Sequence, residues 1–153
     1  MNKQCSKCGQ VKPLDQFTKD NKGKDGYRAY CKACASKYMA RYYSQQPRGR
    51  YHRLRDNASS QKIRFDITAE DFIKWWTVQK PICFYCGQTL TDGVYRKHRL
   101  TDMTIDRKEP SKGYILSNMV LACRRCNLMK GDWLTVEQTL EIAERYFKPV
   151  LRG

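Results

Sequence analysis

The cysteines constrain this sequence more than any other feature. All eight fall in pairs separated by two residues: Cys5/Cys8, Cys31/Cys34, Cys83/Cys86 and Cys123/Cys126. Uniform Cys-x-x-Cys spacings are typical of zinc ligands, and disulfide bonding is the alternative. The polar start MNKQCSKCGQ has no signal peptide, which favours a reducing, cytoplasmic setting and therefore zinc. Because small modules bury too little surface to be stable alone, we expect two structural zinc ions to stabilise this fold.

The first zinc site is predicted within residues 1–38. Its first Cys-x-x-Cys pair is followed by Gly9, which suits the tight turn of a zinc knuckle. Its second pair leads into a helix-favouring run, Ala35 to Gln45. A knuckle followed by a pair on a helix is the arrangement of a treble clef or a related zinc ribbon. Four thiolates close the coordination shell of zinc, so the ion is expected to be structural.

The middle of the chain is predicted to be mostly helical. Residues 39–62 are interpreted as a basic helical linker that is broken at Pro47 and Gly49. The alternation of IRFDI, residues 63–67, predicts a short strand. Thr68 then begins a helix, with Asp71 at the position that completes a capping-box pattern.

The C-terminal segment is predicted to end in an amphipathic helix. Thr135 and Gln138 form a capping-box pattern, and apolar residues at three- and four-residue spacing follow until Pro149. Trp133, just before this helix, is expected to pack under the functional site. A hairpin or loop is expected between Leu90 and Met103.

The charge of the chain is strongly positive. Thirty lysines and arginines against fifteen acidic residues give a formal net charge of +15, and residues 1–62 carry most of this surplus. A nucleic-acid backbone is the expected partner, with a merely solvated basic surface as the alternative. No apolar run is long enough to span a membrane.

The stretch from Thr104 to Asp132 contains the candidate chemistry. Asp106 follows two strand-favouring residues, and Asn127 follows the last Cys-x-x-Cys pair at the start of a predicted helix. A carboxylate and a carboxamide placed in this way can supply two oxygen ligands to one Mg²⁺ or Mn²⁺ ion. In the alternative interpretation, Asp106 is a turn residue and Asn127 is an amide on a helix surface.

The order of features around this stretch resembles the HNH endonucleases. It comprises Cys83-x-x-Cys86-Gly87, Ile105-Asp106-Arg107, Lys112-Gly113-Tyr114, Asn118 and Cys123-x-x-Cys126-Asn127. The resemblance is greatest to the zinc-stapled HNH proteins of bacteriophages, which are related to recombination endonuclease VII. The run CSKCG-x-x-K-P-L-x-x-F, residues 5–17, is similar to an element often found ahead of such domains.

The resemblance implies a small zinc-stabilised α+β fold. Its parts would be an N-terminal treble-clef-like or zinc-ribbon-like module (1–38), the helical linker (39–62) and a C-terminal HNH ββα-metal domain (63–153). The C-terminal domain would contain the second zinc site and flanking helices. The implied activity is metal-dependent hydrolysis of phosphodiester bonds in double-stranded DNA. The protein would act as a monomer or a dimer in the cytoplasm, which would be the host-cell cytoplasm if a phage encodes it.

The same resemblance assigns roles to the site residues. Asp106 and Asn127 would hold the catalytic Mg²⁺ or Mn²⁺, and Asn118 would brace the loop between the two strands. Most HNH sequences have a general-base histidine where this chain has Arg107, and arginine stays protonated at working pH. Arg107 would instead neutralise phosphate charge. His98, a second metal ion or the substrate phosphate would then activate the water.

Two further functions remain compatible with the sequence. One is a catalytically degenerate HNH scaffold that binds DNA as a packaging or regulatory factor, which the presence of Arg107 favours. The other is an RNA-binding or protein-interaction zinc module.

Overall fold

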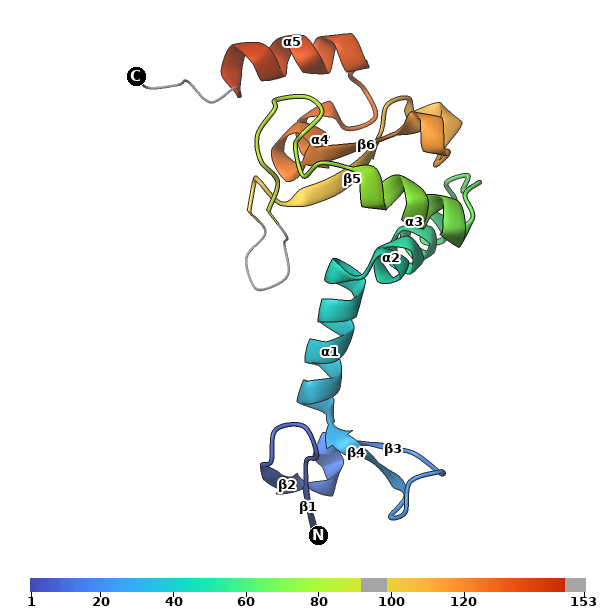
Figure 1. Ribbon diagram of the computed structural model, residues 1–153, viewed down its shortest axis with the longest axis vertical. Helices are drawn as coiled ribbons and strands as arrows, with labels where there is room; N and C mark the ends of the chain where they lie inside the picture. The colour runs from blue at the N-terminus through green and yellow to red at the C-terminus, as the bar shows by residue number, and fades with distance from the viewer. Residues whose placement is uncertain (92–98, 148–153) are drawn as a thin grey trace. The chain divides into compact units, whose positions relative to one another are not determined.

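The computed structural model describes residues 1–91 and 99–147, and Figure 1 shows the chain. The protein divides into two compact units, Met1–Tyr42 and Tyr43–Gly153. Both combine helices with short antiparallel strand pairs, as the predicted zinc-stabilised α+β fold requires. None of the helices in the described residues is long and apolar enough to cross a membrane.

The first unit is built around two strand pairs. Strand β1 (Asn2–Gln4) pairs with β2 (Val11–Pro13), and β3 (Phe17–Lys19) pairs with β4 (Tyr27–Cys31). The knuckle turn joins β1 to β2, and a 3₁₀ turn, η1 (Leu14–Gln16), precedes β3. Gly9 closes the knuckle with a φ of +71°, a conformation that glycine adopts without strain.

The core of the first unit consists mainly of its metal ligands. Cys5, Phe17 and Cys31 are buried, and Tyr27 and Tyr30 pack against them. Helix α1 (Lys32–Gln45) begins directly after Cys31, three residues before the predicted start, and continues past the end of this unit. A core this small agrees with the expectation that the unit depends on a bound metal.

Helix α2 (Pro47–Ser60) belongs to the second unit, whereas the sequence predicted a linker over 39–62. The break predicted at Pro47 is confirmed, because α1 ends at Gln45 and α2 begins with Pro47, whereas Gly49 does not break the run. Pro47 lies in the first turn of α2, where its missing N–H costs nothing, and Gly49 is buried within the helix. Tyr51 of α2 packs against Phe72, with ring centroids 5.7 Å apart. This aromatic contact joins α2 to α3 (Ala69–Val78).

The expected helix start at Thr68 is confirmed, because its side chain accepts a hydrogen bond from the Asp71 N–H at 3.1 Å. The strand predicted over residues 63–67 is wrong. The structure has one isolated bridge there, between Phe65 and Tyr114. The partly buried Phe65 ring packs against Tyr51 and Tyr114, and this packing explains the apolar residue at the centre of the alternating pattern.

The remainder of the second unit is a hairpin followed by helices. Strand β5 (Met103–Arg107) pairs antiparallel with β6 (Met119–Cys123), and the 3₁₀ turns η2 (Pro110–Lys112) and η3 (Leu116–Asn118) lie between them. Helix α4 (Arg124–Lys130) follows β6 at once and packs against both strands. Helix α5 (Val136–Tyr146) lies beside α4, as Figure 1 shows.

The capping box predicted at the start of the last helix is confirmed. Thr135 accepts from the Gln138 N–H, and the Gln138 side chain accepts from the Thr135 N–H. A corresponding local contact starts α4, where the Cys123 sulfur accepts from the Cys126 N–H at 3.4 Å. The ββα arrangement therefore places the third and fourth cysteines of the second cluster at the junction of strand and helix.

Candidate functional site

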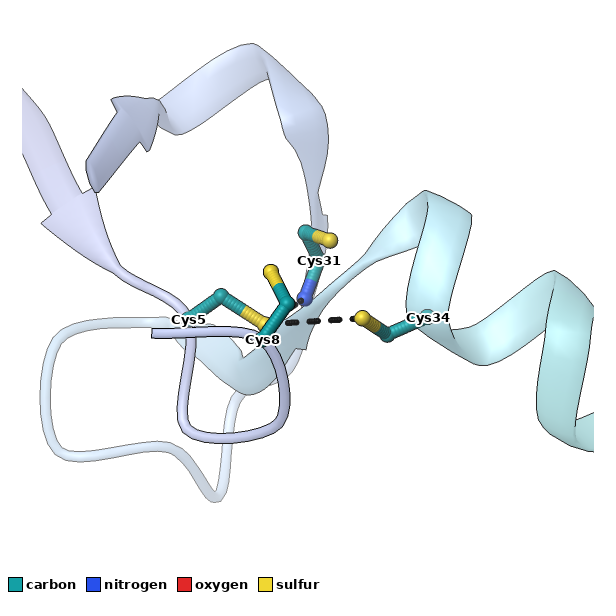
Figure 2. Close-up of side chains that lie close together, drawn as sticks. All are labelled: Cys5, Cys8, Cys31 and Cys34. Carbon is teal, nitrogen blue, oxygen red and sulfur yellow. Dashed lines mark hydrogen bonds between the residues drawn. The ribbon is translucent and has the colours of Figure 1, made fainter. Parts of the chain in front are cut away.

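The four cysteines of the first unit converge, as Figure 2 shows. Their Sγ atoms all lie within 4.8 Å of one another, and those of Cys5 and Cys34 are 3.8 Å apart. A tetrahedral zinc ion with Zn–S bonds of about 2.3 Å requires sulfurs about 3.8 Å apart. A disulfide needs about 2.05 Å. The geometry therefore fits zinc and excludes disulfides in this arrangement.

Backbone N–H groups favour the thiolate form at this cluster. The Cys5 sulfur accepts hydrogen bonds from the N–H groups of Cys31 at 3.3 Å and Lys7 at 3.4 Å. The Cys31 N–H makes the largest contribution to lowering the pKa of Cys5 to about 6. Because the thiolate is the form that binds metal, these N–H donors favour binding of a metal ion at the knuckle.

The second cluster, Cys83, Cys86, Cys123 and Cys126, is buried on all sides. The sulfurs of Cys86 and Cys123 are also 3.8 Å apart. Two strand residues, Leu121 and Ala122, pack around the cysteines together with Tyr85. Four buried thiols with tetrahedral spacing fit a structural zinc ion with a closed coordination shell.

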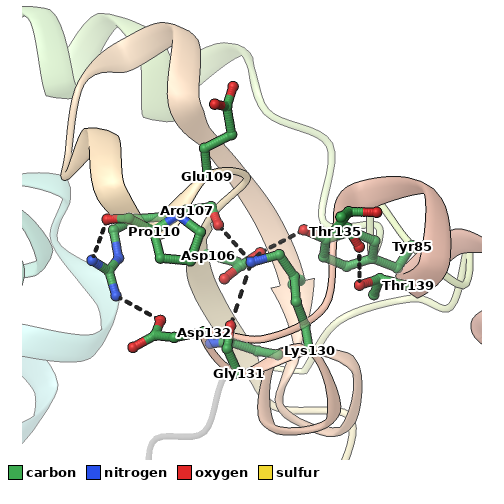
Figure 3. Close-up of polar contacts among 12 residues, drawn as sticks. Tyr85, Asp106, Arg107, Glu109, Pro110, Lys130, Gly131, Asp132, Thr135 and Thr139 are labelled. Carbon is green, nitrogen blue, oxygen red and sulfur yellow. Dashed lines mark hydrogen bonds and ion pairs between the residues drawn. The ribbon is translucent and has the colours of Figure 1, made fainter.

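Asp106 lies next to this cluster, at the penultimate position of β5. Only 6% of its surface is exposed. The Tyr85 hydroxyl donates a 2.5 Å hydrogen bond to Oδ2 of Asp106, and the Lys130 ammonium lies 3.5 Å from the same oxygen (Figure 3). Burial raises the pKa of the Asp106 carboxyl, while these two donors oppose that shift.

Asn127 lies on the same side of β5 as Asp106. Its Nδ2 donates to the Thr104 hydroxyl at 3.0 Å. Thr104 and Asp106 are two positions apart on β5 and so share a face, while Asn127 and Lys130 are one turn apart on α4. The contacts Asn127–Thr104 and Lys130–Asp106 therefore both join α4 to the same face of β5.

The Arg107 side chain is fixed on three sides. Its guanidinium donates to the Pro110 carbonyl at 2.9 Å and to the Asp132 carboxylate at 3.1 Å. It also lies over the Tyr114 ring, 5.4 Å from the centroid. The guanidinium charge is thus held in one place beside the candidate site, but it cannot accept a proton.

Asn118 makes contacts that span the loop between the two strands. Its Oδ1 accepts from the Glu109 N–H at 2.9 Å, and its Nδ2 donates to the carbonyls of Glu109 and Gly113, each at 2.8 Å. The side chain is 3% exposed. These bonds are those of a residue that braces the loop.

Sequence reasoning missed the residues that surround Asp106. Tyr85 lies between the cysteines of the second knuckle, and Lys130 lies three residues after Asn127, so both could have been suspected from their positions. His98 lies outside the described residues. Trp133 was expected to pack under the site, but it is 83% exposed. It follows the end of α4, where Gly131 has a φ of +52°, and its indole lies against this glycine.

One comparison with a solved structure bears on the fold. No protein-family model matches the sequence. A solved structure of the rare-cutting HNH restriction endonuclease PacI superposes with a TM-score of 0.51 at 21% identity, over 94% of this chain and 92% of that chain. This chain has an HNH-endonuclease fold. The predicted HNH resemblance and fold class are thereby confirmed.

A viral protein is related in sequence. Over 102 residues, which cover 65% of this chain, the sequence is 32% identical to the uncharacterized protein R423 of Acanthamoeba polyphaga mimivirus. The chain spans only 17% of the length of that relative. The matched segment therefore corresponds to a small part of a much longer protein.

Proposed function

We propose that this protein is a metal-dependent DNA endonuclease that hydrolyses phosphodiester bonds with an HNH-type site. The observation that carries the proposal is the buried Asp106 carboxylate near the end of β5, a strand against which the helix that carries Asn127 packs, within an HNH fold. Carboxylate and carboxamide oxygens are hard donors that suit Mg²⁺ or Mn²⁺.

Asp106 and Asn127 are the residues that would hold the ion. When bound, it would polarise the scissile phosphate and stabilise the departing 3′ oxygen. Arg107 would provide positive charge for the phosphate from its fixed position between Pro110 and Asp132. Because Arg107 cannot take the proton of the attacking water, that proton must go to another group, for which His98 and the substrate phosphate are the candidates.

A basic hollow in the second unit supports DNA as the substrate. It has a volume of about 250 Å³ and adjoins β5 at Thr104 and Ile105. Arg50, Arg53 and Arg124 contribute to its lining. Guanidinium groups gathered beside the strand that ends in the candidate site can bind successive phosphates of a nucleic acid backbone.

A plasmid-nicking assay tests the proposal. Zinc-loaded protein with Mg²⁺ or Mn²⁺ should convert supercoiled plasmid to the nicked or linear form, and Asp106→Ala and Asn127→Ala should each abolish this. Asp66→Ala is a matched control, because Asp66 is an exposed carboxylate of the same unit that pairs with Arg64. Nicking that survives in Asp106→Ala would refute the assignment.

The second candidate is a non-enzymatic DNA-binding protein with an HNH fold. Arg107 favours it, because this residue stands at the position of the family's general base and is held by contacts within the protein. Salt-sensitive DNA binding without nicking by any variant, including the wild type, would support this candidate. Preferential binding of RNA would instead indicate an RNA-binding module.

A further inference from the structure

Two side chains contact the same oxygen of Asp106. The Tyr85 hydroxyl donates to Oδ2 at 2.5 Å, and Lys130 Nζ lies 3.5 Å from that atom. Figure 3 shows the two groups reaching the carboxylate from different elements. We call Tyr85 and Lys130 together the Asp106 clamp. Neither of these contacts involves Oδ1.

The three side chains of this group are almost completely buried. Tyr85 is 3% exposed and Lys130 is 0% exposed, compared with 6% for Asp106. Lysine is rarely buried to this extent unless its charge is paired, because desolvating an ammonium is costly. A buried ion pair such as Lys130–Asp106 adds little net stability, because desolvation offsets the attraction between the two charges. We therefore expect this pair to have a role in the candidate site.

The Lys130 ammonium has a hydrogen-bond acceptor for each of its three N–H groups. Besides Asp106, it donates to the Arg107 carbonyl at 2.8 Å and to the Gly131 carbonyl at 3.5 Å. An ammonium has three N–H donors, and three acceptors surround this one. The group is therefore held at the end of α4, in a fixed position relative to the backbone of β5.

The second zinc cluster holds both parts of the clamp. Tyr85 lies between Cys83 and Cys86 and packs among the cysteines, and Lys130 lies four residues after Cys126 on α4. The knuckle is joined to the hairpin by a hydrogen bond from the Phe84 N–H to the Leu121 carbonyl at 2.8 Å. The zinc cluster and the Asp106 carboxylate are thus connected by short, buried contacts.

We propose that Tyr85 and Lys130 are positioning residues, which fix Oδ2 of Asp106 so that Oδ1 is presented to a divalent cation. The inference rests on the proposed function, since it assumes that Asp106 is a metal ligand. Groups that hydrogen-bond a metal ligand orient it and tune its affinity, and their loss commonly weakens metal binding about 10- to 100-fold. The clamp also gives the second zinc ion a function beyond stability, because it sets the position of the catalytic carboxylate through Tyr85.

The Tyr85→Phe variant tests the clamp with minimal disturbance, because it removes only the hydroxyl and keeps the buried ring. Tyr51→Phe is the matched control. It also removes a buried tyrosine hydroxyl from the second unit, one that donates to the Ile67 carbonyl at 3.2 Å and does not contact Asp106. Zinc content and thermal unfolding are measured for both variants, so that a folding defect is recognised.

Mn²⁺ binding is measured by isothermal titration on the zinc-loaded full chain, with Asp106→Asn as the reference without a carboxylate. Tyr85→Phe should weaken Mn²⁺ affinity about tenfold, and Tyr51→Phe should leave it unchanged. In the nicking assay, the Tyr85→Phe variant should be slower than the wild type at limiting Mn²⁺. Its nicking rate should recover at high Mn²⁺, and its KM for DNA should be unchanged. A merely structural tyrosine would not give this rescue by metal.

The outcomes separate the clamp from the proposed function. If Asp106→Asn loses Mn²⁺ binding while Tyr85→Phe binds like the wild type, the clamp is wrong and the proposed metal site stands. If the wild type binds Mn²⁺ no better than Asp106→Asn, the proposed function and the clamp both fail. Lys130→Met gives a second test: weaker Mn²⁺ binding supports positioning, whereas tighter binding would show that the ammonium only competes with the metal.

Discussion

The loop between β5 and β6 should depend on the amide of Asn118. Asn118→Asp keeps the size and shape of the side chain and replaces Nδ2 with an oxygen. That oxygen would face the carbonyls of Glu109 and Gly113, to which Nδ2 now donates at 2.8 Å, while the bond from the Glu109 N–H could persist. Two carbonyls would lose their donor and meet an acceptor instead.

The expected cost follows from these bonds. Leaving a buried polar group unsatisfied costs about 1–3 kcal/mol, so two such groups predict a loss of about 2–6 kcal/mol. At low pH the introduced carboxyl group becomes protonated, and a carboxylic acid can donate one of the two lost bonds. The deficit relative to the wild type should therefore be smaller near a pH of about 4.5 than near a pH of about 7.5, because the ordinary pKa of an aspartate is about 3.9 and burial raises it.

Chemical denaturation in zinc-containing buffer, followed by circular dichroism, measures this loss. Asn57→Asp is the control, because it makes the same chemical change at an exposed position of α2 and should alter the free energy of unfolding by less than about 0.5 kcal/mol. A value for Asn118→Asp no larger than that of the control would refute the bracing role. A deficit that does not change with pH would refute the hydrogen-bond explanation.

The same geometry gives three further predictions. Gly113→Ala should lower the free energy of unfolding by about 2 kcal/mol or more, because Gly113 has a φ of +67° and a Cβ would clash with the Arg64 carbonyl oxygen; thermal unfolding measures this. Because burial raises the pKa of Asp106, Mn²⁺ binding should weaken on acidification at a higher pH than for an exposed aspartate; titrations at several pH values, with zinc content monitored, test this. Arg53→Ala should weaken DNA binding and reduce its salt dependence, whereas Arg64→Ala, which lies outside the lining of the basic hollow, should not.

The sequence predicted those parts of the fold that depend on local spacing. Cys-x-x-Cys pairs and capping boxes are formed by residues close together in the chain, so their geometry is largely determined by the neighbouring backbone. Both four-cysteine clusters and the capped starts of α3 and α5 were found where they were expected. The HNH fold, by contrast, was predicted from the resemblance of the order of features around Asp106 to a known family.

The parts that the sequence did not predict depend on contacts between distant residues. Tyr85 and Asp106 are 21 positions apart, and no spacing rule brings them together. The strand expected over 63–67 is a segment whose partly buried Phe65 side chain packs in an aromatic cluster, and an alternating sequence pattern cannot distinguish such a segment from a strand. Likewise, α2 joins the second unit through Tyr51 and Phe72, a pairing visible only in three dimensions.

The most direct test of the central claim is a crystal structure of the zinc-loaded protein soaked with Mn²⁺, with the manganese located by its anomalous scattering. The account predicts one manganese peak bound by side-chain oxygens of Asp106 and Asn127, with the Tyr85 hydroxyl still on Oδ2. A manganese peak elsewhere, or Asp106 and Asn127 side chains that bind no metal at saturating Mn²⁺, would contradict it.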